Sequence, residues 1–316
     1  MGERPSRFAR VGTLYGYVFP QFVPRDDLRP FGARPLPETV RLRWLGTAGY
    51  VIETGRTTIL IDPYLTRAPV AKLATSRLAP DESAVRARLP SRVDAILCGH
   101  SHFDHLLDAP LIASITGAKL VGSATTCAFG RGHGLSPAQL VEVGERGLEL
   151  TVGDAVIHFV PSLHAKLLFG RVPFPGVVTS APRVPSHTWQ YRMGGAFGIY
   201  VRAGGVTIYH NGSADLIDAE LRDRADLLLV GIAGRRATPS YLERLTRRLR
   251  PSVIVPAHHD AFFAPLDAGL RLLPGIDMDG FVSELGRVAP EAQVITPLYD
   301  ETLWFDPARG GAFLST

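Results

Sequence analysis

Cysteine and lysine are scarce in this chain of 316 residues, which contains two cysteines and three lysines. Two cysteines argue against a disulfide framework and fit a reducing compartment. No apolar run approaches the ~20 residues of a membrane span, and the first residues lack the apolar core of a signal peptide. We therefore expect a cytoplasmic protein with no transmembrane segment.

A concentrated positive charge is also missing, although the formal net charge is +4. The basic residues are scattered, and the densest group, Arg247, Arg248 and Arg250, falls at the end of a predicted helix. No basic stripe with interleaved aromatic residues appears, so no nucleic-acid partner is expected. The hydrophobic fraction of 46% and the charged fraction of 20% are typical of a globular protein with a substantial core.

The chain divides into a short arm and one larger unit. Residues 1–38 are rich in proline, arginine and aromatic residues without a regular period, which predicts an extended arm packed on the main body. Residues 39–316 are predicted to form a single domain. Hairpin patterns alternate there with buried strands and amphipathic helices, as near 93–115 and 226–255. This order indicates an α/β fold with two sheets covered by helices.

Three histidines and an aspartate crowd into His100-Ser101-His102-Phe103-Asp104-His105, directly after a predicted buried strand. Histidine and aspartate are costly to bury without partners, but imidazole and carboxylate are the usual ligands of zinc and similar ions. Other polar residues also follow predicted strands, and strand ends that face one way converge in space. They are Asp62, His164, His210 or Asp215, and His258. The joint pattern predicts a metal site.

A stretch rich in proline and glycine, residues 165–196, separates His164 from the strand that begins at Phe197. Long ordered loops often serve as lids, so we predict a substrate-shaping lid; a surface loop with its own small core is the alternative. Two arginines of this lid could bind an anionic substrate, or they could lie on a solvated surface loop. The candidate substrate contacts are Arg171, Arg183, His187, Trp189 and Tyr191.

These segments together resemble the metallo-β-lactamase-fold metal-dependent hydrolase superfamily. The resemblance covers roughly residues 40–300 and looks closest to the branch with L-ascorbate-6-phosphate lactonase and the N-acyl-phosphatidylethanolamine phospholipase D type enzymes. It implies a four-layer αββα sandwich in which helices flank two mixed sheets. It rests on segments 44–53 (WLGTAGYVIE), 59–63 (ILIDP), 100–105 (HSHFDH), His164, 212–215 (GSAD) and 256–258 (PAH).

The resemblance also implies two divalent metal ions, with zinc expected and manganese or iron as alternatives. His100, His102 and His164 would bind the first ion. Asp104, His105 and His258 would bind the second. Asp62 would orient ligand imidazoles by hydrogen bonding. His259 competes with His258 for the last ligand position; the Pro-x-His spacing favours His258 and leaves His259 for substrate or catalysis.

One segment departs from the family pattern. Many relatives have Gly-Asp-Thr where this chain has Gly212-Ser213-Ala214, so serine stands where the carboxylate that bridges the metals is usual. We expect Asp215 to take the bridging role, and His210 or Asn211 could contribute. If the bridge is missing, the second metal binds weakly.

The predicted activity is hydrolysis of an ester, lactone or phosphodiester of a small molecule by a metal-activated water. Asp104, Asp62 and His259 are the candidate catalytic residues. A di-iron oxidoreductase and a nuclease on the same fold are the alternatives, and β-lactam hydrolysis is disfavoured because no cysteine ligand accompanies the second metal set. The sequence leaves open whether the chain forms a homo-oligomer.

Overall fold

The computed structural model describes residues 18–32, 40–167, 169–306 and 310–315. Their strands form a nine-stranded sheet, a seven-stranded sheet and a small two-stranded sheet. The nine-stranded sheet has the order β1-β18-β17-β2-β3-β4-β6-β7-β8, and the seven-stranded sheet the order β16-β15-β14-β13-β12-β10-β9. Both mix parallel and antiparallel pairs, as predicted.

The strands have the following bounds. In the nine-stranded sheet they are β1 (Phe31–Gly32), β2 (Val40–Gly46), β3 (Gly49–Glu53), β4 (Thr58–Ile61), β6 (Ala95–Leu97), β7 (Lys119–Gly122), β8 (Leu140–Glu142), β17 (Thr302–Asp306) and β18 (Gly311–Ser315). In the seven-stranded sheet they are β9 (Leu148–Val152), β10 (Ala155–Pro161), β12 (Phe197–Ala203), β13 (Val206–Asn211), β14 (Leu227–Gly231), β15 (Val253–Ala257) and β16 (Gln293–Val294). The small sheet pairs β5 (Arg77–Leu78) with β11 (Ser186–His187).

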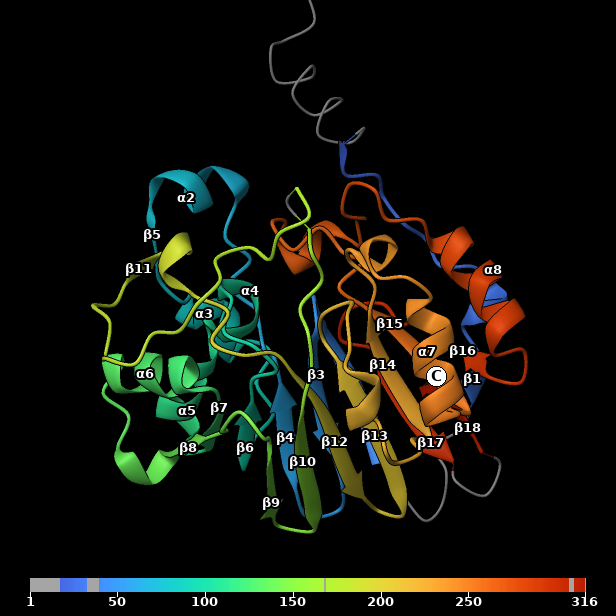
Figure 1. The fold of residues 1–316 in the computed structure, drawn as a ribbon, viewed down its shortest axis with the longest axis horizontal. Helices are drawn as coiled ribbons and strands as arrows, with labels where there is room; N and C mark the ends of the chain where they lie inside the picture. Colours follow the sequence, from blue (N-terminus) through green and yellow to red (C-terminus); the bar gives the residue numbers. More distant parts are fainter. Residues whose placement is uncertain (1–17, 33–39, 168, 307–309, 316) are drawn as a thin grey trace, which may run out of the picture.

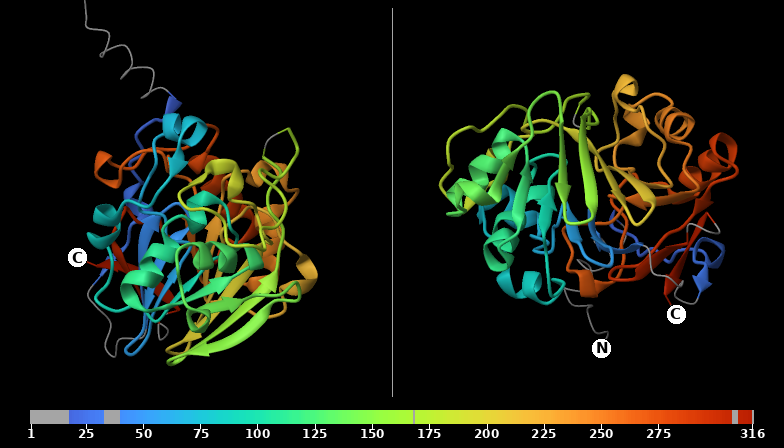
Figure 2. Two further views of the ribbon diagram at one scale, coloured as in Figure 1. Left: turned by 90° about the vertical axis from the view of Figure 1, so that its left-hand side faces the viewer. Right: turned by 90° about the horizontal axis from the view of Figure 1, so that it is seen from below.

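The helices lie on the outer faces of the two large sheets. Figure 1 shows α5 and α6 on one side of the molecule and α7 and α8 on the other, and the views in Figure 2 agree. The α-helices are α2 (Val70–Thr75), α3 (Glu82–Arg86), α4 (Phe103–Leu106), α5 (Ala109–Thr116), α6 (Ala124–Gly132), α7 (Tyr241–Leu249) and α8 (Met278–Val288). Short 3₁₀ turns are η1 (Asp26–Leu28), η2 (Pro137–Gln139), η3 (Thr188–Gln190), η4 (Asp218–Glu220), η5 (Arg235–Ala237) and η6 (Leu266–Ala268).

Three buried clusters correspond to the three interfaces of a four-layer sandwich. The central cluster joins inward-facing residues of both sheets, such as Leu42 and Ile157. A second cluster packs the nine-stranded sheet against its helices, and a third packs the seven-stranded sheet against α7 and α8 through residues such as Leu245 and Phe281. Alternation along β2 explains the sorting, since Val40 and Leu42 point into the core and Arg41 is only half-buried. The predicted αββα architecture is therefore confirmed.

The described part of the predicted arm, residues 18–32, packs on the body. The Phe22 backbone N–H donates to the Leu270 carbonyl at 2.8 Å, and the Leu272 N–H donates to the Pro20 carbonyl at 2.9 Å. Strand β1 pairs with β18 in parallel. Residues 1–17 and 33–38 of the arm lie outside the described residues. Within the described ranges, no helix is long and apolar enough to cross a membrane.

Parallel pairing brings several strand ends to one edge. Strands β4 and β6 are parallel, so the residues after Ile61 and Leu97 leave the sheet together. Strands β13, β14 and β15 are parallel to one another, and β10 runs in the same direction because both β10 and β13 are antiparallel to β12. The segments after these strands carry the histidines and aspartates singled out by the sequence.

Candidate metal centre

His100, His102 and His164 form the first group of candidate ligands. One ring nitrogen from each lies within 4.8 Å of the others, and all three residues are buried. His100 follows β6, His102 immediately precedes α4, and His164 follows β10. The three rings are pairwise 4.8 Å apart between centroids, which leaves a shared space between their edges.

Asp104, His105 and His258 form a second group, whose ligand atoms also lie within 4.8 Å of one another. Asp104 Oδ2 lies 3.2 Å from His258 Nε2 and 3.7 Å from His105 Nε2. Asp104 and His105 belong to α4, and His258 follows β15 with a left-handed backbone at φ 57°. Such a conformation is strained for a residue other than glycine and is common at functional sites.

Asp62 holds His105 from behind. Its Oδ2 accepts a hydrogen bond from His105 Nδ1 at 2.9 Å, and its Oδ1 accepts one from the Gly99 N–H at 2.7 Å. A Cβ at Gly212 would lie 2.8 Å from Asp62 Oδ2, so glycine at that position leaves room for the carboxylate. The bond to Nδ1 leaves His105 Nε2 as the free ring nitrogen, which is the arrangement that metal-ligating histidines need.

Two other ligand rings are held by backbone carbonyls. His102 Nε2 donates to the Pro173 carbonyl at 2.9 Å, and His164 Nδ1 donates to the Ala165 carbonyl at 2.8 Å. The second nitrogen of each ring is then an acceptor free for a cation. The Nε2 atoms of His100 and His105 are buried and have no hydrogen-bond partner among the described residues. Buried acceptors without partners are costly, so these groups fit a divalent metal ion.

The charge state of the group also fits a metal. Burial lowers the pKa of His102 to about 4 and that of His164 to about 3, so both imidazoles are neutral at pH 7 and can act as ligands. Burial alone would raise the pKa of Asp104, but the imidazoles of His105 and His258 lower it well below its usual range. His102 and His164 therefore present neutral nitrogens and Asp104 presents an ionised carboxylate, which are ligands typical of zinc.

A cavity of about 210 Å³ opens above these residues. Five candidate ligands form its floor, and its walls are apolar. No lysine or arginine occurs among the described residues that line it. The floor consists of His100, His102, Asp104, His164 and His258, and the walls of Phe103, Leu167, Pro173, Phe174, Ala233, Phe262 and Leu273.

Asp215 does not reach the metal groups, contrary to our expectation. Its Oδ1 accepts a hydrogen bond from the neighbouring Leu216 N–H at 2.8 Å, and it belongs to none of the candidate groups found among the described residues. Ser213 Oγ accepts from the Ala165 N–H at 3.1 Å, and Asn211 Nδ2 donates to the Ser213 and Asp215 carbonyls. His210 Nε2 donates to the Ala48 carbonyl. In this arrangement the carboxylate of Asp215 belongs to no candidate metal group among the described residues, so the bridging role stays a prediction without support from the geometry.

His259 likewise is not among the described residues that line the cavity, so the geometry gives its expected catalytic role no support. The residue is fully buried, and its ring stacks on Trp44 with centroids 4.8 Å apart. Phe22 from the arm contacts the ring by its edge. Of the two histidines, His258 belongs to a candidate metal group among the described residues and His259 does not.

The predicted lid reaches the cavity, but through residues other than those we singled out. His187 stacks on Trp189 beside α2, and Tyr191 is buried against Phe129 with centroids 4.3 Å apart. Arg171 and Arg183 are exposed and do not line the cavity. The lid residues that do line it are Leu167, Pro173 and Phe174. In the sequence these three residues are marked only by their apolar character. Apolar residues in the loop's own core have the same character, so the sequence does not distinguish the two kinds.

Comparison with known proteins agrees with this geometry. The family model described as "Beta-lactamase superfamily domain" matches residues 41–258. A "UPF0173 metal-dependent hydrolase" of Anaeromyxobacter dehalogenans is 32% identical over 274 residues, covering 83% of this chain and 89% of the relative. A UPF0173 protein of Pyrococcus furiosus is 29% identical over 227 residues, covering 71% and 85%.

Solved structures share the fold at lower identity. Igni18, described as a metallo hydrolase from Ignicoccus hospitalis, has a TM-score of 0.56 and 21% identity, covering 85% of this chain and 99% of its own. CmlA, described as a diiron beta-hydroxylase from Streptomyces venezuelae, has a TM-score of 0.55 and 17% identity, covering 86% and 55%. At these identities the likeness concerns the fold alone.

Proposed function

The chain belongs to the beta-lactamase superfamily domain family and, within it, to the UPF0173 metal-dependent hydrolases, and from this premise we propose that it hydrolyses an ester or lactone of an apolar substrate. The observation that carries the proposal is a floor of metal-binding groups beneath an apolar cavity that presents no lysine or arginine from the described residues.

We propose that His100, His102 and His164 hold one divalent ion and that Asp104, His105 and His258 hold another. Zinc is the proposed metal because neutral imidazole and carboxylate are its common ligands, and manganese and iron are the alternatives. When bound, such ions supply a water of lowered pKa and polarise the bond to be cleaved.

Asp104 and Asp62 have different tasks in this proposal. Asp104 lies on the cavity floor and stays ionised at neutral pH, so it is placed to orient the nucleophilic water by accepting a hydrogen bond from it. Asp62 has no access to the cavity and acts by holding His105 in one orientation. The walls, including Phe174 and Phe262, exclude solvent around the scissile group.

The walls also favour a neutral substrate over an anionic one. A phosphodiester would have to rely on the bound metal ions alone to offset its lost solvation, because no guanidinium or ammonium group from the described residues lines the apolar walls. An ester or lactone carries no such charge and develops it only at the reacting oxygen, next to the metal groups. The sequence resemblance to the lactonase and phospholipase D type branch stays a prediction.

The experiment combines metal analysis with a substrate panel. We expect the purified protein to hold up to two equivalents of zinc and to cleave 4-nitrophenyl esters or γ-lactones faster than bis(4-nitrophenyl) phosphate. The cleavage should stop when the metal is removed by a chelator and return with zinc. Faster cleavage of the phosphodiester would reject the substrate class, and full activity of metal-free protein would reject the mechanism.

Iron content separates the proposed hydrolase from the oxidoreductase alternative. A di-iron enzyme needs iron as its metal, whereas hydrolysis by an activated water proceeds with zinc. If the protein purified from a medium with both metals holds only iron, and zinc fails to restore cleavage, the oxidoreductase is the better hypothesis.

A further inference from the structure

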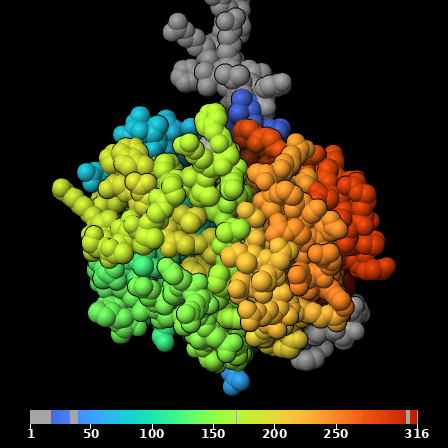
Figure 3. Space-filling view, in the orientation of Figure 1, coloured from blue at the N-terminus to red at the C-terminus, as the bar shows by residue number. Residues whose placement is uncertain are grey.

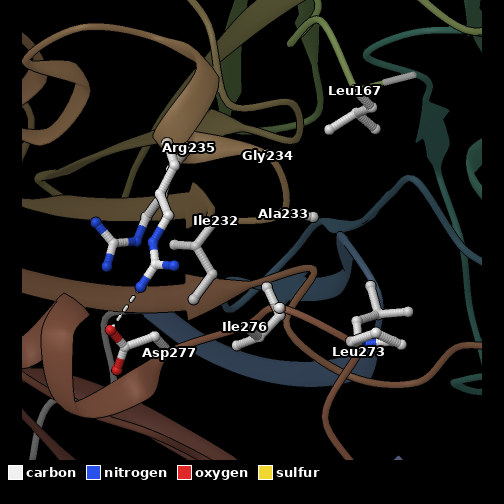
Figure 4. A pocket seen from close by; sticks show the side chains of 11 residues that line it. Leu167, Ile232, Ala233, Gly234, Arg235, Leu273, Ile276 and Asp277 are labelled. Atoms are coloured by element: carbon white, nitrogen blue, oxygen red, sulfur yellow. Dashed lines mark hydrogen bonds and ion pairs between the residues drawn. The ribbon is translucent and has the colours of Figure 1, made fainter. Parts of the chain in front are cut away.

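A second cavity, of about 330 Å³, adjoins the cavity above the metal groups. The two share three lining residues, Leu167, Ala233 and Leu273. Figure 4 shows these three on one side of the second cavity, with Arg235 and Asp277 on the opposite side. The shared residues form the junction between the two spaces.

The second cavity is lined mainly by apolar groups, among them Ile232, Pro274 and Ile276. Its two arginines are already paired. Arg235 forms an ion pair with Glu284, and Arg236 Nη2 lies 2.8 Å from Asp277 Oδ2. Arg235 and Asp277 lie on the side of this space away from the shared residues, so the part next to the junction suits an uncharged apolar group.

Gly234 shapes the junction. Its backbone is left-handed at φ +81°, and a Cβ at this position would collide with the Leu167 side chain. Glycine therefore lets Leu167 of the lid lie directly over the loop after β14. Figure 3 shows the yellow-green lid segment against the orange second half of the chain.

The segment that leads from β10 into the lid also presents apolar side chains to solvent. Leu163 is 47% exposed, Leu167 is 44% exposed and Phe169 is 99% exposed. All three come from the short segment that follows β10. Several exposed apolar side chains in one segment beside an apolar cavity are typical of a site that receives an apolar ligand.

We infer that the two cavities form one channel and that the substrate carries an unbranched apolar acyl chain. The scissile carbonyl lies above the metal groups, and the chain passes Ala233 between Leu167 and Leu273 into the space lined by Ile232 and Ile276. This inference rests on the proposed function and names its substrate class. A channel for an acyl chain explains why the cavity above the metal ligands and the neighbouring cavity, which has no metal ligands among its described lining residues, share an apolar boundary.

The test uses binding rather than turnover. Alkyl hydroxamic acids of two, six and twelve carbons carry the same metal-binding head, and calorimetry with the zinc-loaded full chain gives their dissociation constants. A chain that enters the channel should lower the dissociation constant about threefold to fourfold for each buried methylene, which is the expected gain from removing a CH₂ from water. The dodecanoyl compound should bind at least a hundredfold more tightly than the acetyl compound.

Ala233→Leu tests the junction, because added methyl groups at Ala233 narrow the passage. It should weaken binding of the dodecanoyl compound tenfold or more and leave the acetyl compound within about twofold. Ala219→Leu, the same change at an exposed position of η4, is the matched control and should affect neither. Ile276→Asp, which puts a carboxylate into the second cavity only, should give the same selective loss.

Three outcomes overturn the inference. Equal affinity for the three chain lengths would show that the second cavity is not part of the site, while the proposed hydrolase would stand. Equal loss of short and long compounds in Ala233→Leu would place the effect at the metal centre and reject the channel. Failure of the acetyl compound to bind the zinc-loaded protein would reject the proposed metal centre and, with it, the inference.

Discussion

Asp62 accepts a hydrogen bond from His105 Nδ1 at 2.9 Å while the opposite nitrogen of the same ring faces the candidate metal groups. Both side chains are fully buried. The carboxylate follows β4 and the imidazole belongs to α4, so parallel pairing of β4 with β6 brings them together. The hydrogen bond between Asp62 and His105 therefore fixes a candidate metal ligand relative to the nine-stranded sheet.

Asp62→Asn should weaken metal binding about tenfold to a hundredfold, the usual effect of losing a hydrogen-bonding partner behind a ligand. The amide keeps the size of the side chain but loses the charge that favours the required tautomer. Competition with a fluorescent chelator measures the affinity. Asp279→Asn, at an exposed position of α8, is the control. Equal affinities in both variants would contradict the assigned role.

His102→Ala should abolish hydrolysis and lower the zinc content, because a ligand of the first group is removed. Its ring also donates a hydrogen bond to the Pro173 carbonyl, but His102 belongs to none of the core clusters, so the fold should persist. Metal analysis measures the zinc content, circular dichroism checks the fold, and an ester assay measures hydrolysis. His133→Ala, at a half-buried position after α6, serves as control and should keep its activity.

Asp215→Ala should leave the affinity for both metals unchanged, because the carboxylate bonds to the Leu216 N–H and lies outside the ligand groups. Zinc titration of the wild type should show one tight equivalent and a weaker second one, since this loop supplies no bridge. A selective loss of the second equivalent in Asp215→Ala would restore the bridging role that the sequence suggested.

Phe174→Ala should raise KM for an apolar ester severalfold, because Phe174 forms part of the cavity wall and contacts the ring of His102 by its edge. Arg171→Ala and Arg183→Ala should keep kcat/KM within about twofold, since both arginines are exposed. Kinetics on esters of one chain length make the comparison. A larger effect of either arginine would favour an anionic substrate after all.

The metal-free protein should lose stability as the pH falls from about 6.5 to 4. Burial lowers the pKa of His259 to about 4, so in this range the unfolded chain binds a proton that the folded chain refuses. The free energy of unfolding therefore decreases with falling pH, by roughly 3 kcal/mol for this one residue. Urea unfolding at several pH values measures the slope.

His259→Phe should reduce that slope by the contribution of His259, because phenylalanine keeps the stacking on Trp44 without a titrating group, while His102 and His164 still contribute. It should also retain hydrolytic activity, as expected of a residue outside the cavity. An unchanged slope would assign the acid sensitivity to other groups, and loss of activity with intact metal binding would return His259 to the catalytic residues.

The sequence predicted the alternation of β2 and the buried strands before His100 and His258. Each of these patterns depends on residues only a few positions apart. The sequence also predicted the candidate ligands of segment 100–105. Two of them lie on α4 and two lie before it, so local geometry sets their relative positions. The same local reasoning failed in the lid. Tyr191 and Phe174 are both aromatic residues of one loop, yet one stacks on Phe129 in the core and the other lines the cavity.

The sequence by itself determined two sheets covered by helices and a cluster of imidazoles at 100–105, because hydrophobic periodicity and clustered imidazoles are local properties. The resemblance to the superfamily implied the four-layer αββα order and the assignment of ligands to two metal ions. Only the tertiary structure showed Asp215 outside the candidate metal groups and joined Ala233 to Leu167 at the cavity wall. It also placed His258, which the Pro-x-His spacing favoured, in such a group. Those outcomes depend on how side chains from distant strands and loops pack against one another. Such contacts follow from the whole fold, so no short segment contains them.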